Sequence, residues 1–346
     1  MVSLGYKISS EEFGPADLIG FAVDAERAGF EFGLISDHYH PWTNRQGQSP
    51  FVWTVIGAIA QATSAIRIGT AVTCPTIRVH PAIVAQAAST AATLMGDRFF
   101  LGVGTGENLN EHVVGHGWPS PDVRLEMLEE AITVMRLLWQ GGVKSHRGRH
   151  YTVEDARLYT LPESPPELMV AASKPHAAEL AGRLGDAMIN VEVDRELIRR
   201  FEHAGGSRDA KKFIELGVCW AEDERQARKT AHEVWALAAL GGPLFTELAQ
   251  PSHFEAAFEP ISEDMVAEVV TCGPDPKRFL EAIEKAQRAG YTHVCLHQIG
   301  PEQRQFLDFA EREIFPALGN GSEPRRKPSA GSRPPSREHD RPAARG

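Results

Sequence analysis

The chain has 346 residues, 42% of them apolar, and a formal net charge of −10 at pH 7. An acidic balance argues against nucleic acid as the main partner. No segment approaches the roughly 20 apolar residues of a membrane helix, and the first residues do not resemble a signal peptide, so we expect no membrane partner. The four cysteines lack the close spacing of zinc or redox motifs. We therefore expect no metal site and reduced, buried thiols in a cytoplasmic protein.

Strand-like and helix-like segments alternate along most of the chain. The predicted strands are nearly continuous apolar runs, as expected for parallel strands covered on both faces. In chain order they are LGYKIS, FGLISD, IRIGTAVT, RFFLGVGTG, LMVAAS, AMINV, KFIELGVCWA and HVCLHQI. One-sided spacing marks the helices between them, as at Leu128, Ile132 and Met135. About eight β–α units over roughly 300 residues predict an α/β fold, a (β/α)8 TIM barrel. An open doubly wound sheet is the alternative.

Two long segments interrupt this alternation, and a biased segment closes the chain. Residues 141–166 and 241–265 are longer than ordinary connections, so we expect insertions at the C-terminal face of the barrel, where they would cover its mouth. Residues 319–346 are rich in Pro, Ser and Arg and poor in large apolar side chains, which predicts a disordered tail. The remaining residues, 1–318, are expected to form a single barrel domain.

Polar residues gather where the predicted strands end, which is where the active site of an α/β barrel lies. The second strand ends in Asp37 and His38. His38 is the best acid–base candidate, because a free imidazole titrates near neutrality. Asp37 would orient His38 or cap the following loop, and Trp42 would form an apolar wall. The alternative is a core histidine that bonds a backbone carbonyl.

The segment GVGTGEN follows the fourth predicted strand. Its glycines at 102, 104 and 106 depart from the G-x-G-x-x-G dinucleotide fingerprint, so we expect no Rossmann site. Glu107 follows this turn, where glycines would let the backbone approach a ligand. The alternative for Glu107 is an ordinary acid near a helix N-terminus.

A weaker signal for a phosphate site follows the fifth predicted strand. Ser173 and Lys174 precede Pro175, a common first residue of a helix. Free N–H groups, the helix dipole and the Lys174 cation would suit a phosphate. The same pattern is also ordinary at the start of a helix.

Several motifs together resemble one known family. They are LGYKISSEEF, SDHYHPW, GTAVTCPT, HPAIVAQA, FFLGVGTGENLNEH and AGRLGD. The chain resembles the luciferase-like barrel oxidoreductases, and among them the F420-dependent glucose-6-phosphate dehydrogenases and their relatives. The resemblance implies a barrel that binds coenzyme F420, a deazaflavin that carries hydride, and it implies a homodimer. It also implies a non-prolyl cis peptide behind the cofactor ring, which would fall at Ala71-Val72.

The resemblance implies roles for single residues. His38 would accept the proton of a substrate hydroxyl, and Trp42 would pack over substrate and ring. Glu11 would shape the site, and Glu107 would be the proton donor near the ring. The residues implied to bind the cofactor are Asp37, Ala71, Val72, Cys74, Gly104, Thr105, Gly106, Asn110, Ser173 and Lys174.

Some positions depart from the family pattern. Lys174 stands where a glycine is usual, and it would either add a cation for the cofactor tail or crowd the backbone. The sugar-phosphate enzymes carry cations where this chain has Glu192 to Asp194 and Ala256. Acids facing a phosphate dianion would weaken its binding. We therefore expect a small-molecule substrate other than glucose 6-phosphate: an alcohol, a carbonyl compound or an activated alkene.

Two alternative functions would use the same fold. An FMN-dependent luciferase-like monooxygenase would need a reductase partner and oxygen, but the motifs lie closer to the F420 branch. A carrier of flavin or deazaflavin without turnover would need no acid–base pair. The presence of His38 together with Glu11 and Glu107 therefore argues against a carrier.

Overall fold

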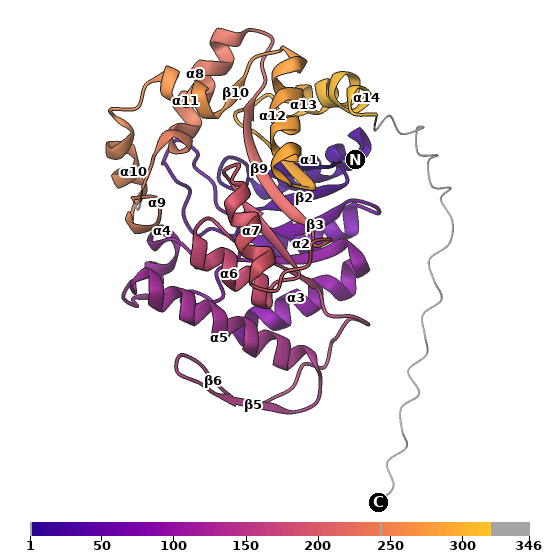
Figure 1. Ribbon diagram of the computed structural model, residues 1–346, viewed down its shortest axis with the longest axis vertical. Coiled ribbons are helices and arrows are strands. Elements are labelled where there is room, and N and C mark those ends of the chain that lie inside the picture. Colours follow the sequence, from indigo (N-terminus) through magenta and orange to yellow (C-terminus); the bar gives the residue numbers. More distant parts are fainter. Residues whose placement is uncertain (1, 243, 320–346) are drawn as a thin grey trace, which may run out of the picture.

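The computed structural model describes residues 2–242 and 244–319, so the tail expected over 319–346 lies, except for its first residue, outside the described residues. Eight parallel strands follow one another around a closed barrel, and the β8–β9 and β11–β1 pairings complete the circle (Figure 1). The predicted TIM barrel is confirmed. The alternative of an open doubly wound sheet is wrong, because β8 pairs with β9 and closes the sheet. The barrel strands are β1 (Ser3–Ile8), β2 (Phe32–Ile35), β3 (Arg67–Thr70), β4 (Phe99–Val103), β7 (Glu167–Ala171), β8 (Ala187–Asn190), β9 (Lys212–Cys219) and β11 (His293–Gln298).

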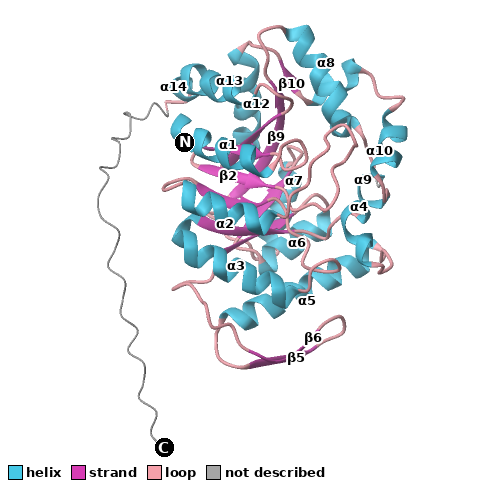
Figure 2. Ribbon diagram, turned by 180° about the vertical axis from the view of Figure 1, so that it is seen from behind, coloured by secondary structure: helices cyan, strands magenta, loops and turns pink. Residues whose placement is uncertain are grey.

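Helices surround the barrel on its outside (Figure 2). The longer ones bury one apolar side against the strands, as the spacing predicts: Leu128, Ile132 and Met135 of α5 are all buried. The helices that follow barrel strands are α1 (Pro15–Ala28), α2 (Val52–Ala62), α3 (Pro81–Met95), α4 (Asn108–Glu111), α5 (Pro121–Trp139), α6 (Pro175–Leu184), α7 (Arg195–His203), α8 (Glu224–Trp235), α13 (Gln303–Phe309) and α14 (Phe315–Ala317). A short strand, β10 (Thr271–Cys272), pairs with β9 and precedes α12 (Pro276–Ala289).

Aromatic side chains fill the barrel interior. Phe213 of β9 contacts Phe32 of β2 and Phe100 of β4, with ring centroids 5.3 and 5.5 Å apart. Neither β2 nor β4 is a sheet neighbour of β9, so these contacts cross the barrel. This part of the interior is therefore a packed core, and the active site of such a barrel is expected at the rim where the strands end.

The two long insertions behave differently. Residues 141–166 contain an antiparallel hairpin of β5 (Lys144–Arg147) and β6 (Thr152–Ala156), which lies beside α5 (Figure 1). There Glu130 of α5 accepts hydrogen bonds from the backbone N–H groups of residues 149, 150 and 151. The second insertion forms α9 (Leu244–Glu247), α10 (Pro251–Phe258) and the start of α11 (Glu263–Val269). The second insertion contacts the loops after β2 and β4: Phe245 and Phe254 pack on Trp42, and Asn108 Nδ2 donates to the backbone carbonyl of Glu247.

Candidate active site

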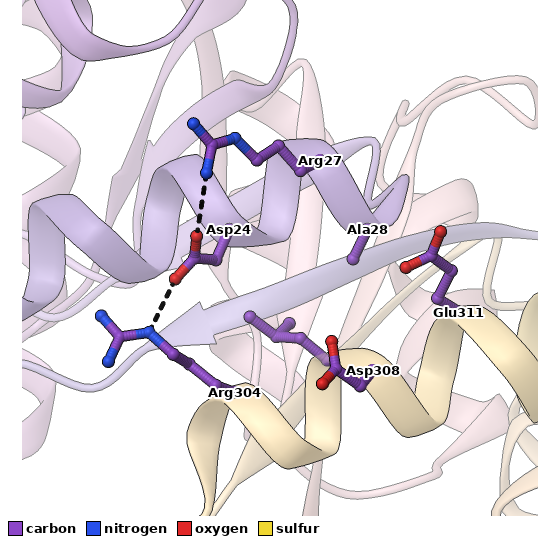
Figure 3. A pocket seen from close by; sticks show the side chains of 7 residues that line it. Asp24, Arg27, Ala28, Arg304, Asp308 and Glu311 are labelled. Atoms are coloured by element: carbon purple, nitrogen blue, oxygen red, sulfur yellow. Dashed lines mark hydrogen bonds and ion pairs between the residues drawn. The ribbon is translucent and has the colours of Figure 1, made fainter. Parts of the chain in front are cut away.

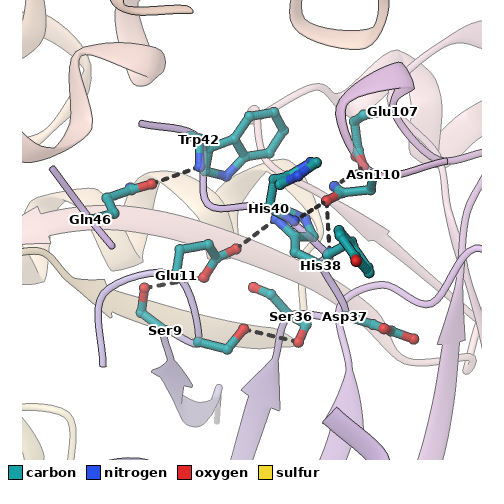
Figure 4. Close-up of polar contacts among 12 residues, drawn as sticks. Ser9, Glu11, Ser36, Asp37, His38, His40, Trp42, Gln46, Glu107 and Asn110 are labelled. Atoms are coloured by element: carbon teal, nitrogen blue, oxygen red, sulfur yellow. Dashed lines mark hydrogen bonds and ion pairs between the residues drawn. The ribbon is translucent and has the colours of Figure 1, made fainter. Parts of the chain in front are cut away.

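His38 and Glu11 meet at the mouth of the barrel because β1 and β2, which their loops follow, are neighbours (Figure 4). His38 Nδ1 lies 3.1 Å from Glu11 Oε1, and both side chains are buried. The contact lacks hydrogen-bond geometry, so among the described residues Nδ1 has no hydrogen-bond partner. Burial alone would raise the pKa of the Glu11 carboxyl, but His38 and Lys7 outweigh burial and lower it. Glu11 is therefore an anion beside the His38 ring.

Trp42 covers His38 and is itself covered by the second insertion. Its ring packs edge-on against His38, with centroids 5.0 Å apart. Phe245 of α9 and Phe254 of α10 contact the ring at 4.7 and 5.2 Å, and Trp42 is only 4% exposed. These rings belong to an apolar cluster that also includes Leu109 of α4. His38 thus lies under an apolar cover. From the sequence, the segment that supplies Phe245 and Phe254 was predicted only as an insertion.

Asn110 connects the His38 loop with Glu107. Its Oδ1 accepts hydrogen bonds from the backbone N–H groups of Tyr39 and His40, at 2.9 and 3.1 Å. Its Nδ2 donates to Glu107 Oε2 at 3.3 Å. Asn110 is buried, and both the oxygen and the nitrogen of its amide form hydrogen bonds. It therefore fixes the His38 loop against α4. Glu107 remains half-buried, with one carboxylate oxygen toward Asn110.

Asp37 directly precedes His38 in the loop after β2, and both of its carboxylate oxygens are hydrogen-bonded or ion-paired. Oδ1 pairs with Arg78 Nη2 at 2.8 Å, and Oδ2 accepts from Thr73 Oγ1 at 2.8 Å. Arg78 also donates its backbone N–H to Glu111 Oε2 at 2.7 Å. The sequence interpretation missed Arg78 and Glu111. Their positions in the loop after β3 and in α4, both at the rim, were the available signal.

Glu111 predicts a pH dependence of stability. Burial raises the pKa of its carboxyl from 4.5 to about 7, although Arg78 opposes this. Between these two values the Glu111 carboxyl keeps its proton in the folded protein and loses it in the unfolded chain. The protonated carboxyl therefore contributes stability that is fully present below pH 4.5 and is lost as the pH rises through 7. We expect the free energy of unfolding of Glu111→Gln, measured with denaturant, to rise relative to that of the wild type by up to about 3 kcal/mol as the pH increases from about 5 to 8. Glu126→Gln, an exposed change on α5, should show no such trend. A difference that is constant with pH would refute the assignment.

The predicted cis peptide at Ala71-Val72 is confirmed. It directly follows β3, and the carbonyl of Ala71 accepts a hydrogen bond from Lys7 Nζ at 3.3 Å. Ala71 and Val72 stay partly exposed at the mouth. They therefore present a small apolar surface among otherwise buried neighbours.

The glycines of GVGTGEN serve close packing between two loops. A Cβ at Gly104 would lie 2.6 Å from Val72 Cγ2. A Cβ at Gly106, where φ is +75°, would lie 2.6 Å from Cys74 Sγ. The turn after β4 can thus press against the loop after β3, with the half-buried Thr105 between the two glycines. Burial raises the pKa of the Cys74 thiol, so the sulfur is uncharged in this packing.

The residues expected near a phosphate or a substrate tail lie in more open surroundings. Ser173 and Lys174 are exposed at the start of α6, and Lys174 stands at the N-cap position without a side-chain cap. Among the described residues, no hydrogen bond or ion pair joins either side chain to the His38 cluster. Asp194 accepts the backbone N–H of residue 196 and so caps α7. Glu192 and Ala256 are both exposed.

A shallow surface pocket of about 260 Å³ lies elsewhere, between α1 and α13. Asp24 there pairs with Arg27 and Arg304 (Figure 3). Its lining contains none of the residues at the barrel mouth. Within residues 2–242 and 244–319, no group of three or more His, Cys, Asp or Glu side chains forms a metal site. None of the helices in these ranges is long and apolar enough to cross a membrane.

Comparison with known proteins agrees with this geometry. Residues 2–293 match the luciferase-like monooxygenase family. Relatives from Tsukamurella paurometabola and Nocardia farcinica, both named F420-dependent glucose-6-phosphate dehydrogenase, are 34% identical over 330 residues. These alignments cover 92% of this chain and 98% of each relative.

Solved structures give the same picture. An F420-dependent secondary alcohol dehydrogenase in complex with an F420–acetone adduct is 31% identical, with a TM-score of 0.86, covering 92% of this chain and 99% of that one. The F420-dependent tetrahydromethanopterin reductase of Methanopyrus kandleri shares the fold at 21% identity and a TM-score of 0.76, covering 91% and 99%. The chain therefore belongs to the luciferase-like monooxygenase family.

Proposed function

We propose that the protein is an F420-dependent oxidoreductase that transfers hydride between F420 and a small alcohol or carbonyl compound. The observation that carries this proposal is the buried His38–Glu11 pair beneath the apolar cover of Trp42, Phe245 and Phe254. Relatives that cover almost the whole chain are named F420-dependent enzymes. An acid–base pair enclosed by apolar rings suits the removal of a hydroxyl proton during oxidation of an alcohol.

The residues at the mouth fit a deazaflavin. A flat ring needs an apolar surface, and the partly exposed Ala71 and Val72 offer one directly after β3. The buried His38 follows the neighbouring β2, and its Nδ1 has no hydrogen-bond partner among the described residues. When bound, F420 supplies a carbon that accepts or donates the hydride. The other residues that would hold the cofactor are Asp37, Cys74, Gly104, Thr105, Gly106, Asn110, Ser173 and Lys174.

The chain's own residues would divide the remaining work. His38 takes the hydroxyl proton of the alcohol, and the Glu11 anion stabilises the imidazolium that forms. Trp42 and the rings of the second insertion exclude water. Glu107, which is half-buried and held by Asn110, would be the proton donor near the ring.

The same surroundings favour an uncharged substrate over a sugar phosphate. The cover of His38 consists of aromatic and aliphatic side chains. At the two places where cations would grip a phosphate, this chain has exposed Glu192 and Ala256. One charged hydrogen bond contributes about 1.5–3 kcal/mol, so a phosphate without such partners binds weakly.

A two-stage experiment tests the proposal. First, F420 and FMN are titrated into the purified protein, and we expect micromolar or tighter binding for F420 alone. Second, F420 reduction is followed with secondary alcohols and with glucose 6-phosphate, and we expect kcat/KM to favour an alcohol by at least about 10-fold. Tight FMN binding without F420 would favour the alternative FMN-dependent monooxygenase. Fast F420 reduction by glucose 6-phosphate would leave the cofactor in place and overturn the substrate class. F420 binding without turnover of any alcohol, carbonyl or alkene would favour a carrier.

We also propose a homodimer, which rests on the family resemblance, and a cytoplasmic location, which rests on the spacing of the cysteines and on the expected absence of a signal peptide. Sedimentation equilibrium with the purified full chain measures the mass directly. A mass of about 38 kDa, equal to one chain, would contradict the dimer.

A further inference from the structure

A second group of charged side chains lies inside the barrel, below His38. Lys7 of β1 pairs with Glu215 of β9 at 2.8 Å. The other oxygen of Glu215 lies 3.2 Å from His297 Nδ1, on β11. Lys7 and His297 are buried, and Glu215 is nearly so. Such a group is costly to bury unless its members neutralise one another.

This group continues toward the mouth. His297 Nε2 faces Glu12 Oε1 at 3.7 Å, which is longer than a hydrogen bond. Glu12 in turn accepts from Ser9 Oγ at 3.1 Å, and the same hydroxyl lies 3.4 Å from Glu11 Oε2. Glu11 then meets His38. A continuous path of polar contacts thus joins His38 to Lys7, which also bonds the carbonyl of the cis peptide.

The charges along this path do not balance. Burial alone would lower the pKa of His297, but Glu12 and Glu215 raise it to about 9, so His297 is a cation at neutral pH. Burial alone would raise the pKa of Glu215, but Lys7 and His297 lower it to about 2. Three acidic side chains, of Glu11, Glu12 and Glu215, thus lie on this path with two basic ones, of Lys7 and His297, before it reaches His38.

We propose that Lys7, Glu12, Glu215 and His297 are positioning residues that set the proton affinity of His38 through Glu11. Each acid on the path strengthens the hold of His38 on its proton, and each cation weakens it. The charge coupling follows from the path alone. The further step, that this coupling suits His38 to accept the proton of an alcohol, rests on the function proposed above.

Few other charges compete for His38. On its own loop, Asp37 is paired with Arg78, and His40 bonds the carbonyl of Leu109. From α4, Glu107 is held by Asn110. The second insertion contacts Trp42, the cover of His38, with Phe245 and Phe254. The Trp235 ring packs against His297 in a T-shaped arrangement, with centroids 4.4 Å apart.

The test is an NMR titration of His38 in the full chain labelled with isotopic histidine, with the signal assigned by its absence in His38→Gln. This readout needs neither cofactor nor substrate. We expect Glu12→Gln to lower the His38 pKa and His297→Gln to raise it, each by at least about 0.5 unit. Glu154→Gln, which removes an exposed acid on β6, is the matched control and should leave the His38 titration unchanged.

Opposite shifts in the two variants are the signature of the charge path, because a merely structural loss would not change sign with the charge removed. Shifts of the same sign, or no shift in either variant, would overturn the proposal. Glu12→Gln decides the matter alone if His297→Gln does not fold, since a fall of the His38 pKa is expected only from the lost acid.

Activity then separates this inference from the proposed function. In an active enzyme, the pH at which kcat/KM rises should move in the same two directions as the NMR pKa. A wild-type protein that does not turn over any alcohol would refute the function while the NMR shifts still test the coupling. An active enzyme whose variants keep the wild-type pH profile would refute the coupling and leave the function standing.

Discussion

His38→Gln is expected to lower kcat for alcohol oxidation by about 10²–10⁴-fold, the usual contribution of a general base. Glutamine keeps the size and polarity of the side chain but does not accept a proton near neutral pH. The aromatic cover from Trp42 and the apolar surface at Ala71-Val72 stay in place, so F420 should bind with a Kd close to that of the wild type. Stopped-flow F420 reduction measures the first quantity, and fluorescence titration measures the second.

His40→Gln is the matched control for this experiment. His40 is two residues further along the same loop and bonds the carbonyl of Leu109 with Nδ1 at 2.9 Å. A glutamine amide can replace that contact, so we expect a kcat within about 3-fold of the wild type, less than 1 kcal/mol. If His38→Gln kept wild-type turnover, or if His40→Gln lost as much as His38→Gln, the role of His38 as the base would be disproved.

Lys7→Met is expected to cause the largest loss of stability among the single changes considered. Lys7 is 5% exposed and neutralises Glu215 inside the barrel. Removing one member of a buried ion pair leaves an uncompensated charge and costs about 3–5 kcal/mol. The melting temperature should fall by at least about 6 °C, measured by calorimetry on the full chain.

Two further variants make this prediction specific. Arg147→Met breaks an exposed pair with Glu154 on the hairpin and should leave the melting temperature unchanged, because exposed pairs contribute little. Adding Glu215→Leu to Lys7→Met removes the stranded charge and should restore part of the lost stability. If the two side chains did not act as a pair, their effects would add. The double variant would then be less stable than Lys7→Met by as much as Glu215→Leu alone destabilises the wild type.

The barrel and the neighbourhood of the site were predictable from the sequence for a simple reason. Eight apolar runs alternate with one-sided helices, and parallel strands bring all their carboxyl ends to one rim. His38 and Glu11 each stand directly after such a run, so their approach followed from the strand order alone. The position of the cis peptide at Ala71-Val72 came from the family resemblance and needed no geometry.

The partners of several residues were not predictable. The contact of Asp37 with the cofactor stays a prediction, whereas only the structure shows that Arg78 and Thr73 engage its carboxylate oxygens. The approach of a ligand to the glycines at 104 and 106 also stays a prediction, whereas only the structure shows that side chains of the neighbouring loop pack against them. In each case the deciding contact joins two loops, whose paths depend on packing more than on any local pattern.

By itself, the sequence determined the strand order and the rim at which the polar residues gather, and it predicts His38 as the acid–base residue. These features depend on residue type and on spacing along the chain. Only the tertiary structure decided that Trp42 lies beneath α9 and α10, and that Lys7 meets Glu215 across 208 positions of sequence. Closing the barrel sets which inward side chains of separate strands face each other, and that register leaves no trace in the residues of either strand alone.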